Sequence, residues 1–109
     1  MKTNVDNPTS PLASEFTTQT NVLASRSLST PYQNTSGKPM AVSVGALVSP
    51  SYDIHAQCDA SNTPTLVVAA QANLLGVSQN LSIFFIVLPG YYYEVFSATG
   101  TKYLWIEYT

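Results

Sequence analysis

The chain has 109 residues, of which 45% are apolar and only 9% are charged, and its formal net charge is −2. This length fits one domain with a single core. The charge balance excludes the basic stripe of a nucleic-acid-binding protein and the polybasic patch that docks on an anionic membrane.

The first 24 residues are polar and rich in Thr, Ser and Asn, with Pro8 and Pro11 and only isolated apolar residues. Neither a helical nor a strand period persists there. We therefore predict an extended N-terminal arm over residues 1–24. Such an arm is either a loose tail or an attachment segment that orders against another subunit, with Phe16 and Leu23 as candidate contacts.

From residue 25 onward, short apolar runs alternate with turn residues, which predicts one β-sandwich domain over residues 25–109. The expected strands are SRSLSTPYQN (25–34), MAVSVGALV (40–48), YDIHAQCD (52–59), TLVVAAQ (65–71), LSIFFIVL (81–88), YYYEVFSA (91–98) and KYLWIEY (102–108). The second and third of these alternate apolar and polar residues with a period of two, as half-buried strands do. Seven to eight short strands with frequent turns predict an all-β fold, an antiparallel β-sandwich or jelly-roll.

Three finer expectations follow from the same pattern. The run 81–88 is apolar on both faces, which predicts a central strand, and it is too short to span a bilayer. The linker TGT gives the last two strands a tight hairpin, with Gly100 available for a positive φ. The segment around Gly76 has room for one helical turn.

The residues offer little chemistry. His55 is the only histidine, and strand alternation puts it on the face opposite Cys58, which disfavours a Cys–His dyad. Asp53, His55 and Asp59 share a face, which fits either a metal site or a solvated strand surface. Glu94 faces either Glu107 or Lys102 across the last hairpin, and neither pairing predicts acid–base chemistry. We expect no enzyme, no cofactor and no internal disulfide, because there is one cysteine.

Aromatic residues concentrate in the last fifth of the chain. The candidate interface residues there are Tyr91, Tyr92, Tyr93, Tyr103, Trp105 and Tyr108. Alternation puts bulky side chains on both faces of the last two strands. One set fills the core by cross-strand pairing, and the other set must be covered by a partner chain. We therefore predict a homo-oligomer, with a trimer favoured.

Three motifs carry a resemblance to a known class of protein. They are YQNTSGKP (32–39), LPGYYY (88–93) and the terminal LWIEY (104–108). Together they resemble bacteriophage tail-fibre and related virion β-modules over residues 26–109. The turn at Leu88–Gly90 is one residue shorter than in that pattern. The motifs consist of turn and strand residues and are not a catalytic signature.

The resemblance implies a β-sandwich without a cofactor, located on the outer surface of a phage particle. The leading expectation is a tail-fibre or receptor-binding module that contacts other subunits and a host-surface glycan or protein. The alternative is a capsid decoration subunit that the N-terminal arm attaches to other virion proteins. A stand-alone carbohydrate-binding module explains the aromatic residues but not the arm. None of these readings involves nucleic acid or membrane insertion.

Overall fold

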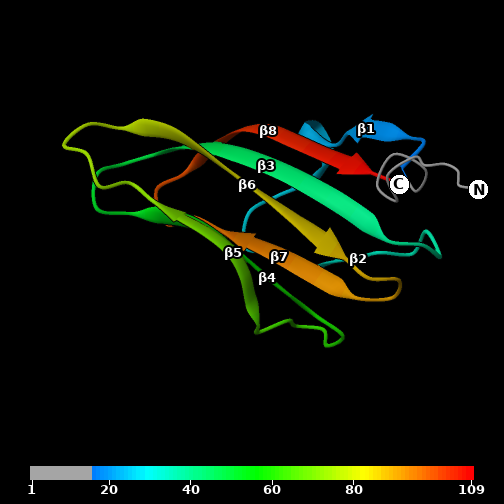
Figure 1. Ribbon diagram of the computed structural model, residues 1–109. Coiled ribbons are helices and arrows are strands. Elements are labelled where there is room, and N and C mark those ends of the chain that lie inside the picture. Colours follow the sequence, from blue (N-terminus) through cyan, green and yellow to red (C-terminus); the bar gives the residue numbers. More distant parts are fainter. Residues whose placement is uncertain (1–15) are drawn as a thin grey trace, which may run out of the picture.

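The computed structural model describes residues 16–109 as two four-stranded antiparallel sheets packed face to face (Figure 1). The elements in chain order are β1 (Gln19–Asn21), the 3₁₀ turn η1 (Leu23–Ser25), β2 (Tyr32–Gln33), β3 (Met40–Val48), β4 (Asp53–Asp59), β5 (Val67–Ala72), β6 (Gln79–Val87), β7 (Tyr92–Phe96) and β8 (Thr101–Tyr108). Sheet 1 has the order β1-β8-β3-β6 and sheet 2 the order β2-β7-β4-β5. The predicted all-β sandwich is confirmed.

The alternating sequences of β3 and β4 account for the core. Val42 and Val44 on β3 and Ile54 on β4 are fully buried, and their polar or small neighbours point outward. β6 follows the same rule, because Leu81, Ile83, Phe85 and Val87 are buried and the residues between them are exposed. The two inner faces therefore meet as in other sandwiches, with side chains from each sheet filling the space between them.

The sandwich begins earlier in the sequence than predicted. β1 pairs with β8, with Gln19 opposite Tyr108 and Asn21 opposite Ile106, and Val22 lies in the core. The boundary predicted near residue 25 is therefore wrong for residues 19–24. The signal was weak because all three residues of β1 are polar and exposed. The predicted arm over residues 1–15 lies outside the described residues.

Two strand assignments also differ from the expectation. β6 lies at the edge of sheet 1 rather than at its centre, although it is apolar on both sides. β7 and β8 belong to different sheets, so the predicted hairpin between them does not form, and their linker crosses from one sheet to the other. Glu94 therefore faces neither Glu107 nor Lys102 across a hairpin. The region around Gly76 is a bend without a helical turn.

Two buried asparagines hold loops at different ends of strands with the same hydrogen bonds. Asn34 donates from Nδ2 to the carbonyls of Lys38 and Val87 and accepts the N–H of Ser36. In each loop the asparagine bonds the N–H two residues on and the carbonyl four residues on, and it reaches a neighbouring strand end. Asn73 uses Leu75, Val77 and Val48 in these three roles. The asparagine side chain thus replaces the backbone partners that a loop would otherwise lack.

Glycines are required at turns for two different reasons. Gly90 has a φ of +81°, and the N–H of Tyr91 bonds the carbonyl of Leu88, which is the pattern of a Pro-Gly turn. Gly100 instead allows a close approach, since a Cβ there would lie 2.4 Å from Oγ of Ser97, and it does not provide the positive φ that we expected. No helix in the described part of the chain is long and apolar enough to cross a membrane.

Gly90→Ala is expected to destabilise the protein by about 1 to 2 kcal/mol, because an L-residue with a side chain is strained in the left-handed region. Gly76→Ala is the matched control, since that residue lacks a positive φ and a Cβ there meets no atom within 4 Å. Urea unfolding followed by circular dichroism measures both. Equal stability of the two variants would contradict the turn geometry.

Candidate interaction surfaces

The core-facing side of β8, near its C-terminal end, carries a buried polar network rather than an exposed interface. Glu107 receives two hydrogen bonds from Arg26, at 3.0 Å from Nε and 3.1 Å from Nη2. The hydroxyl of Tyr93 donates to Glu107, and the indole N–H of Trp105 donates to the Tyr93 hydroxyl at 3.1 Å. The candidate interface residues Tyr93 and Trp105 are therefore core residues in this chain, with almost no exposed surface.

The network extends to the loop between η1 and β2. The guanidinium of Arg26 lies 4.5 Å from the centre of the Tyr32 ring, and the Tyr32 hydroxyl accepts the N–H of Ser27 at 2.7 Å. Lys102 donates to the carbonyls of Leu23 and Arg26, the former at 2.5 Å. Burial and the neighbouring carboxylate of Glu107 raise the pKa of Tyr93 well above its ordinary value. The phenol therefore stays protonated as a donor.

The solvent side of sheet 1 carries an uncharged apolar patch with polar residues at its margins, among them Gln19, Asn21, Asn80 and Ser82. We call this patch the outer face of sheet 1. It consists of Leu47, Phe84, Ile86, Tyr103, Leu104, Ile106 and Tyr108, with the small residues Ala41, Ser43 and Gly45 of β3 between them. Phe84 is 56% exposed and Tyr103 46% exposed. The ring centres of Phe84 and Tyr108 lie 6.5 Å apart, across the small residues of β3. No charged side chain belongs to this face.

Tyr103 reaches the outer face because of a β-bulge. Gly45 pairs with Leu104 and Ala46 pairs with Lys102, so Tyr103 is the extra residue of β8. Its ring covers Gly45, where a Cβ would lie 2.7 Å from Cζ of Tyr103. Strict alternation would place Tyr103 on the side of Trp105, and the bulge turns it to the opposite side. A glycine is thus needed at position 45, because any side chain there would clash with the Tyr103 ring.

The remaining candidate interface residues are dispersed. Tyr91 packs partly against the core, and Tyr92 points outward from sheet 2 opposite Asp59. Leu23 packs against the core from η1, and Phe16 is half-buried near the chain ends. The structure therefore gathers only Tyr103 and Tyr108, of the predicted residues, on one exposed surface. Sequence reasoning missed Phe84 and Ile86, which are exposed because they alternate with buried residues along β6.

The outer side of sheet 2 is polar. Nδ1 of His55 lies 3.4 Å from Asp53, and the His55 ring stacks on Phe96 with 5.1 Å between ring centres. Asp59 instead organises the β4–β5 loop, and hydrogen bonds from the N–H groups of Thr65 and then Ser61 lower its pKa. Among the described residues, no three His, Cys, Asp or Glu side chains are placed to hold a metal ion.

Two buried groups lie outside these surfaces. Cys58 faces the core, away from His55. Burial mainly, and the negative charge of Asp59 to a lesser extent, raise the pKa of the Cys58 thiol to about 11. Glu94 is buried on the polar side of sheet 2 opposite Gln57, and its Oε1 receives no hydrogen bond from the described residues. Cys58 and His55 lie on opposite sides of β4, so they do not form a nucleophile–base pair.

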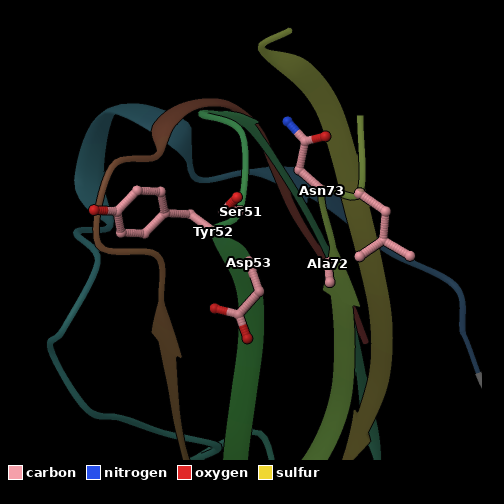
Figure 2. A pocket seen from close by; sticks show the side chains of 6 residues that line it. Ser51, Tyr52, Asp53, Ala72 and Asn73 are labelled. Carbon is pink, nitrogen blue, oxygen red and sulfur yellow. The ribbon is translucent and has the colours of Figure 1, made fainter. Parts of the chain in front are cut away.

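A pocket of about 320 Å³ lies where β5 leaves sheet 2, lined by Ser51, Tyr52, Asp53, Ala72, Asn73 and Leu74. Figure 2 shows that the Tyr52 ring points away from Ala72 and Asn73. The amide of Asn73 is already bonded to Val48, Val77 and Leu75. The Asn73 amide at this pocket is therefore committed to holding its own loop.

Comparisons of this chain with protein-family models, with curated proteins and with solved structures find no match. The interpretation of its surfaces therefore rests on its own geometry and on the sequence motifs.

Tyr93→Phe is expected to cost about 1 to 3 kcal/mol at neutral pH, because it removes a donor from buried Glu107 and the acceptor of Trp105. The folded-state pKa of Tyr93 lies above its unfolded value of 10.0. Its contribution is therefore complete below about pH 10 and is lost as the pH rises further. The stability difference between wild type and variant should narrow above that pH.

Denaturant titrations from pH 7 to 11 measure this difference. Tyr103→Phe is the control, since its ring is exposed and belongs to no buried network. A Tyr93→Phe protein as stable as wild type at pH 7 would contradict the assigned network.

Proposed function

We propose that this chain is a non-catalytic structural subunit of a bacteriophage particle, a tail-fibre or receptor-binding module that acts through contacts with other subunits and with the host surface. The observation that carries the structural role is the uncharged, aromatic outer face of sheet 1. The phage setting rests on the resemblance of residues 26–109 to virion β-modules.

The outer face of sheet 1 is unusual for a free monomer. Monomeric proteins rarely expose a large continuous apolar patch, and interfaces are enriched in aromatic residues. Here Phe84 and Tyr103 contribute exposed rings, and neighbouring residues of β8 extend the apolar surface between them. A partner that covers this face removes the surface from water without burying a charge.

We assign a second copy of the chain to this face, in a homo-oligomer for which a trimer is favoured. A homo-oligomer brings equivalent residues near one another, and a charged face would then create like-charge repulsion. The absence of charge avoids that cost. The resemblance favours three copies, since tail-fibre modules are commonly trimeric.

The motifs behind the resemblance have structural roles that fit a scaffold better than a catalytic site. In YQNTSGKP, Asn34 anchors the loop and Gly37 has a φ of +81°. In LPGYYY, Gly90 makes the turn and Tyr93 enters the core. These residues position loops and strands, and none of them is part of an acid, base or nucleophile constellation.

Phe84→Asp is expected to dissociate the oligomer, because it places a charge in the face that the copies share. Light scattering of wild type at micromolar concentration should give a multiple of 11.7 kDa, and the variant should give a smaller mass. Thr99→Asp is the control, in the exposed β7–β8 linker. A wild-type protein that is monomeric throughout would overturn the assembly role.

The phage setting has its own test. Labelled antibody against the chain, imaged on purified particles of the virus that encodes it, is expected to mark the tail. Label on the shell would replace the tail-fibre assignment with capsid decoration, and particles without label would overturn the virion role.

A further inference from the structure

The loop between β5 and β6 exposes a group of large apolar side chains to solvent. Leu74 is 90% exposed, the largest fraction among the large apolar side chains of the described residues. Leu75 is 53% exposed and Val77 is 64% exposed. We call Leu74, Leu75 and Val77 the apolar loop surface. Single exposed aliphatic residues are ordinary in proteins, but a group of them commonly marks a contact site.

The buried side chain of Asn73 holds this loop in a fixed shape. Its Nδ2 donates to the carbonyls of Val48 and Val77. Its Oδ1 accepts the N–H of Leu75 at 2.9 Å. The backbone carbonyl of Asn73 also accepts the N–H of Ser51, in the β3–β4 loop. The apolar loop surface is therefore preorganised, and a partner that covers it has little conformational freedom to remove.

The apolar loop surface and the outer face of sheet 1 are separate and differ in shape. Figure 1 shows the β5–β6 loop at the end of the sandwich away from β1 and the C-terminus, whereas the outer face lies along the strands of sheet 1. The loop surface contains no charge, since no charged residue lies between Asp59 and Glu94, and the outer face contains none either. The two surfaces can therefore meet without burying an unpaired charge.

We propose that the apolar loop surface of one copy packs on the outer face of sheet 1 of a second copy. This inference deepens the proposed assembly role and rests on it, because it names what covers the outer face. In the contact, Leu74 and Leu75 lie against the exposed rings of Phe84 and Tyr103 of the second copy. Each copy contributes its loop to one neighbour and its outer face to another.

The symmetry of the proposed trimer favours a contact between two different surfaces. A ring of three copies has no two-fold axis, so an outer face does not meet the outer face of a neighbour in an equivalent contact. Each copy must therefore present a second surface that complements its outer face. The apolar loop surface is uncharged and holds Leu74, the most exposed large apolar side chain described. The exposed residues 66–68 are less exposed than Leu74 and lie alongside β4 next to a β-bulge.

Leu74→Lys tests the contact, because it places a charge against the uncharged outer face of the neighbouring copy. We expect the dissociation constant from sedimentation equilibrium to rise by about tenfold or more, since an unpaired charge in an interface opposes association. Thr35→Lys is the matched control for added charge, in the exposed β2–β3 loop at the opposite end of β3. Both positions are exposed, so circular dichroism should show an unchanged fold in both variants. Unchanged association of Leu74→Lys would overturn the inference.

Charge complementation distinguishes this contact from the pairing of two outer faces. In the double variant that combines Leu74→Lys with Phe84→Asp, a lysine of one copy meets an aspartate of the next copy at every contact. We expect the double variant to associate more tightly than either single variant, because opposite charges attract across an interface. If two outer faces met each other, the aspartates would still repel. A double variant that associates no better than Phe84→Asp would therefore overturn the inference.

Cross-linking tests the geometry of the contact directly. Ser43 lies on the outer face between Phe84 and Ile106. Leu75→Cys and Ser43→Cys proteins that are refolded together are expected to form a covalent dimer with a short bis-maleimide. Thr35→Cys refolded with Ser43→Cys is not. Cys58 is buried, and the wild type measures its background reaction. A first mixture that cross-links no more than the wild type would overturn the contact.

The inference and the proposed function fail separately. If Phe84→Asp lowers the mass and Leu74→Lys does not, the loop contact is overturned and the proposed function stands. If Leu74→Lys lowers the mass and Phe84→Asp does not, the contact and the role of the outer face of sheet 1 are both overturned. Wild-type protein that stays monomeric and sediments with phosphatidylcholine vesicles would assign the loop to a lipid surface and overturn the contact between copies.

Discussion

The ion pair between Arg26 and Glu107 sits where the two sheets and the first long loop of the sandwich meet. A carboxylate on the inner face of β8 is costly to bury alone, and a bidentate guanidinium with a tyrosine hydroxyl satisfies it. Tyr93 belongs to sheet 2 and Glu107 to sheet 1, so the network bonds one sheet to the other through side chains. Removing one partner of such a pair typically costs about 3 to 5 kcal/mol, because the other charge stays buried.

This network accounts for the concentration of aromatic residues near the end of the chain. Tyr93 and Trp105 form the inner part, with ring centres 6.4 Å apart, and Tyr32 completes the cluster under the Arg26 guanidinium. The outer part of the same strands supplies Tyr103 and Tyr108 to an exposed face. Bulky residues on both sides of β8 thus serve two separate purposes, one in the core and one at the surface.

The sequence was sufficient to predict the fold class because β3, β4 and β6 alternate with a period of two, which survives in any packing arrangement. β1 escaped prediction because its residues are polar and exposed. The position of Tyr103 depends on a bulge opposite Gly45, and the buried Glu107 finds its partner in Arg26, which is 81 residues away in the sequence. Such long-range contacts leave no periodic signal, so the side of the sheet on which Tyr103 lies could not be predicted.

The use of charge connects the core to the surfaces. Arg26 and Glu107 are bonded to each other, Lys102 is bonded to two carbonyls, and Glu94 is buried. Few charges therefore remain on the outside, and the stretch between Asp59 and Glu94 has none. An outer face without charge lacks the main barrier to association with copies of the same chain. In this account, the chain can associate with copies of itself because several of its charged side chains are paired or buried within the fold.

Hydroxyl-radical footprinting at increasing protein concentration tests this account most directly, because it reports each exposed side chain in the unmodified chain. The account predicts that oxidation of Phe84, Ile86 and Tyr103 falls as the protein associates. Oxidation of Tyr52, which is exposed outside the outer face of sheet 1, should stay constant. Equal oxidation of all four residues at every concentration would contradict it.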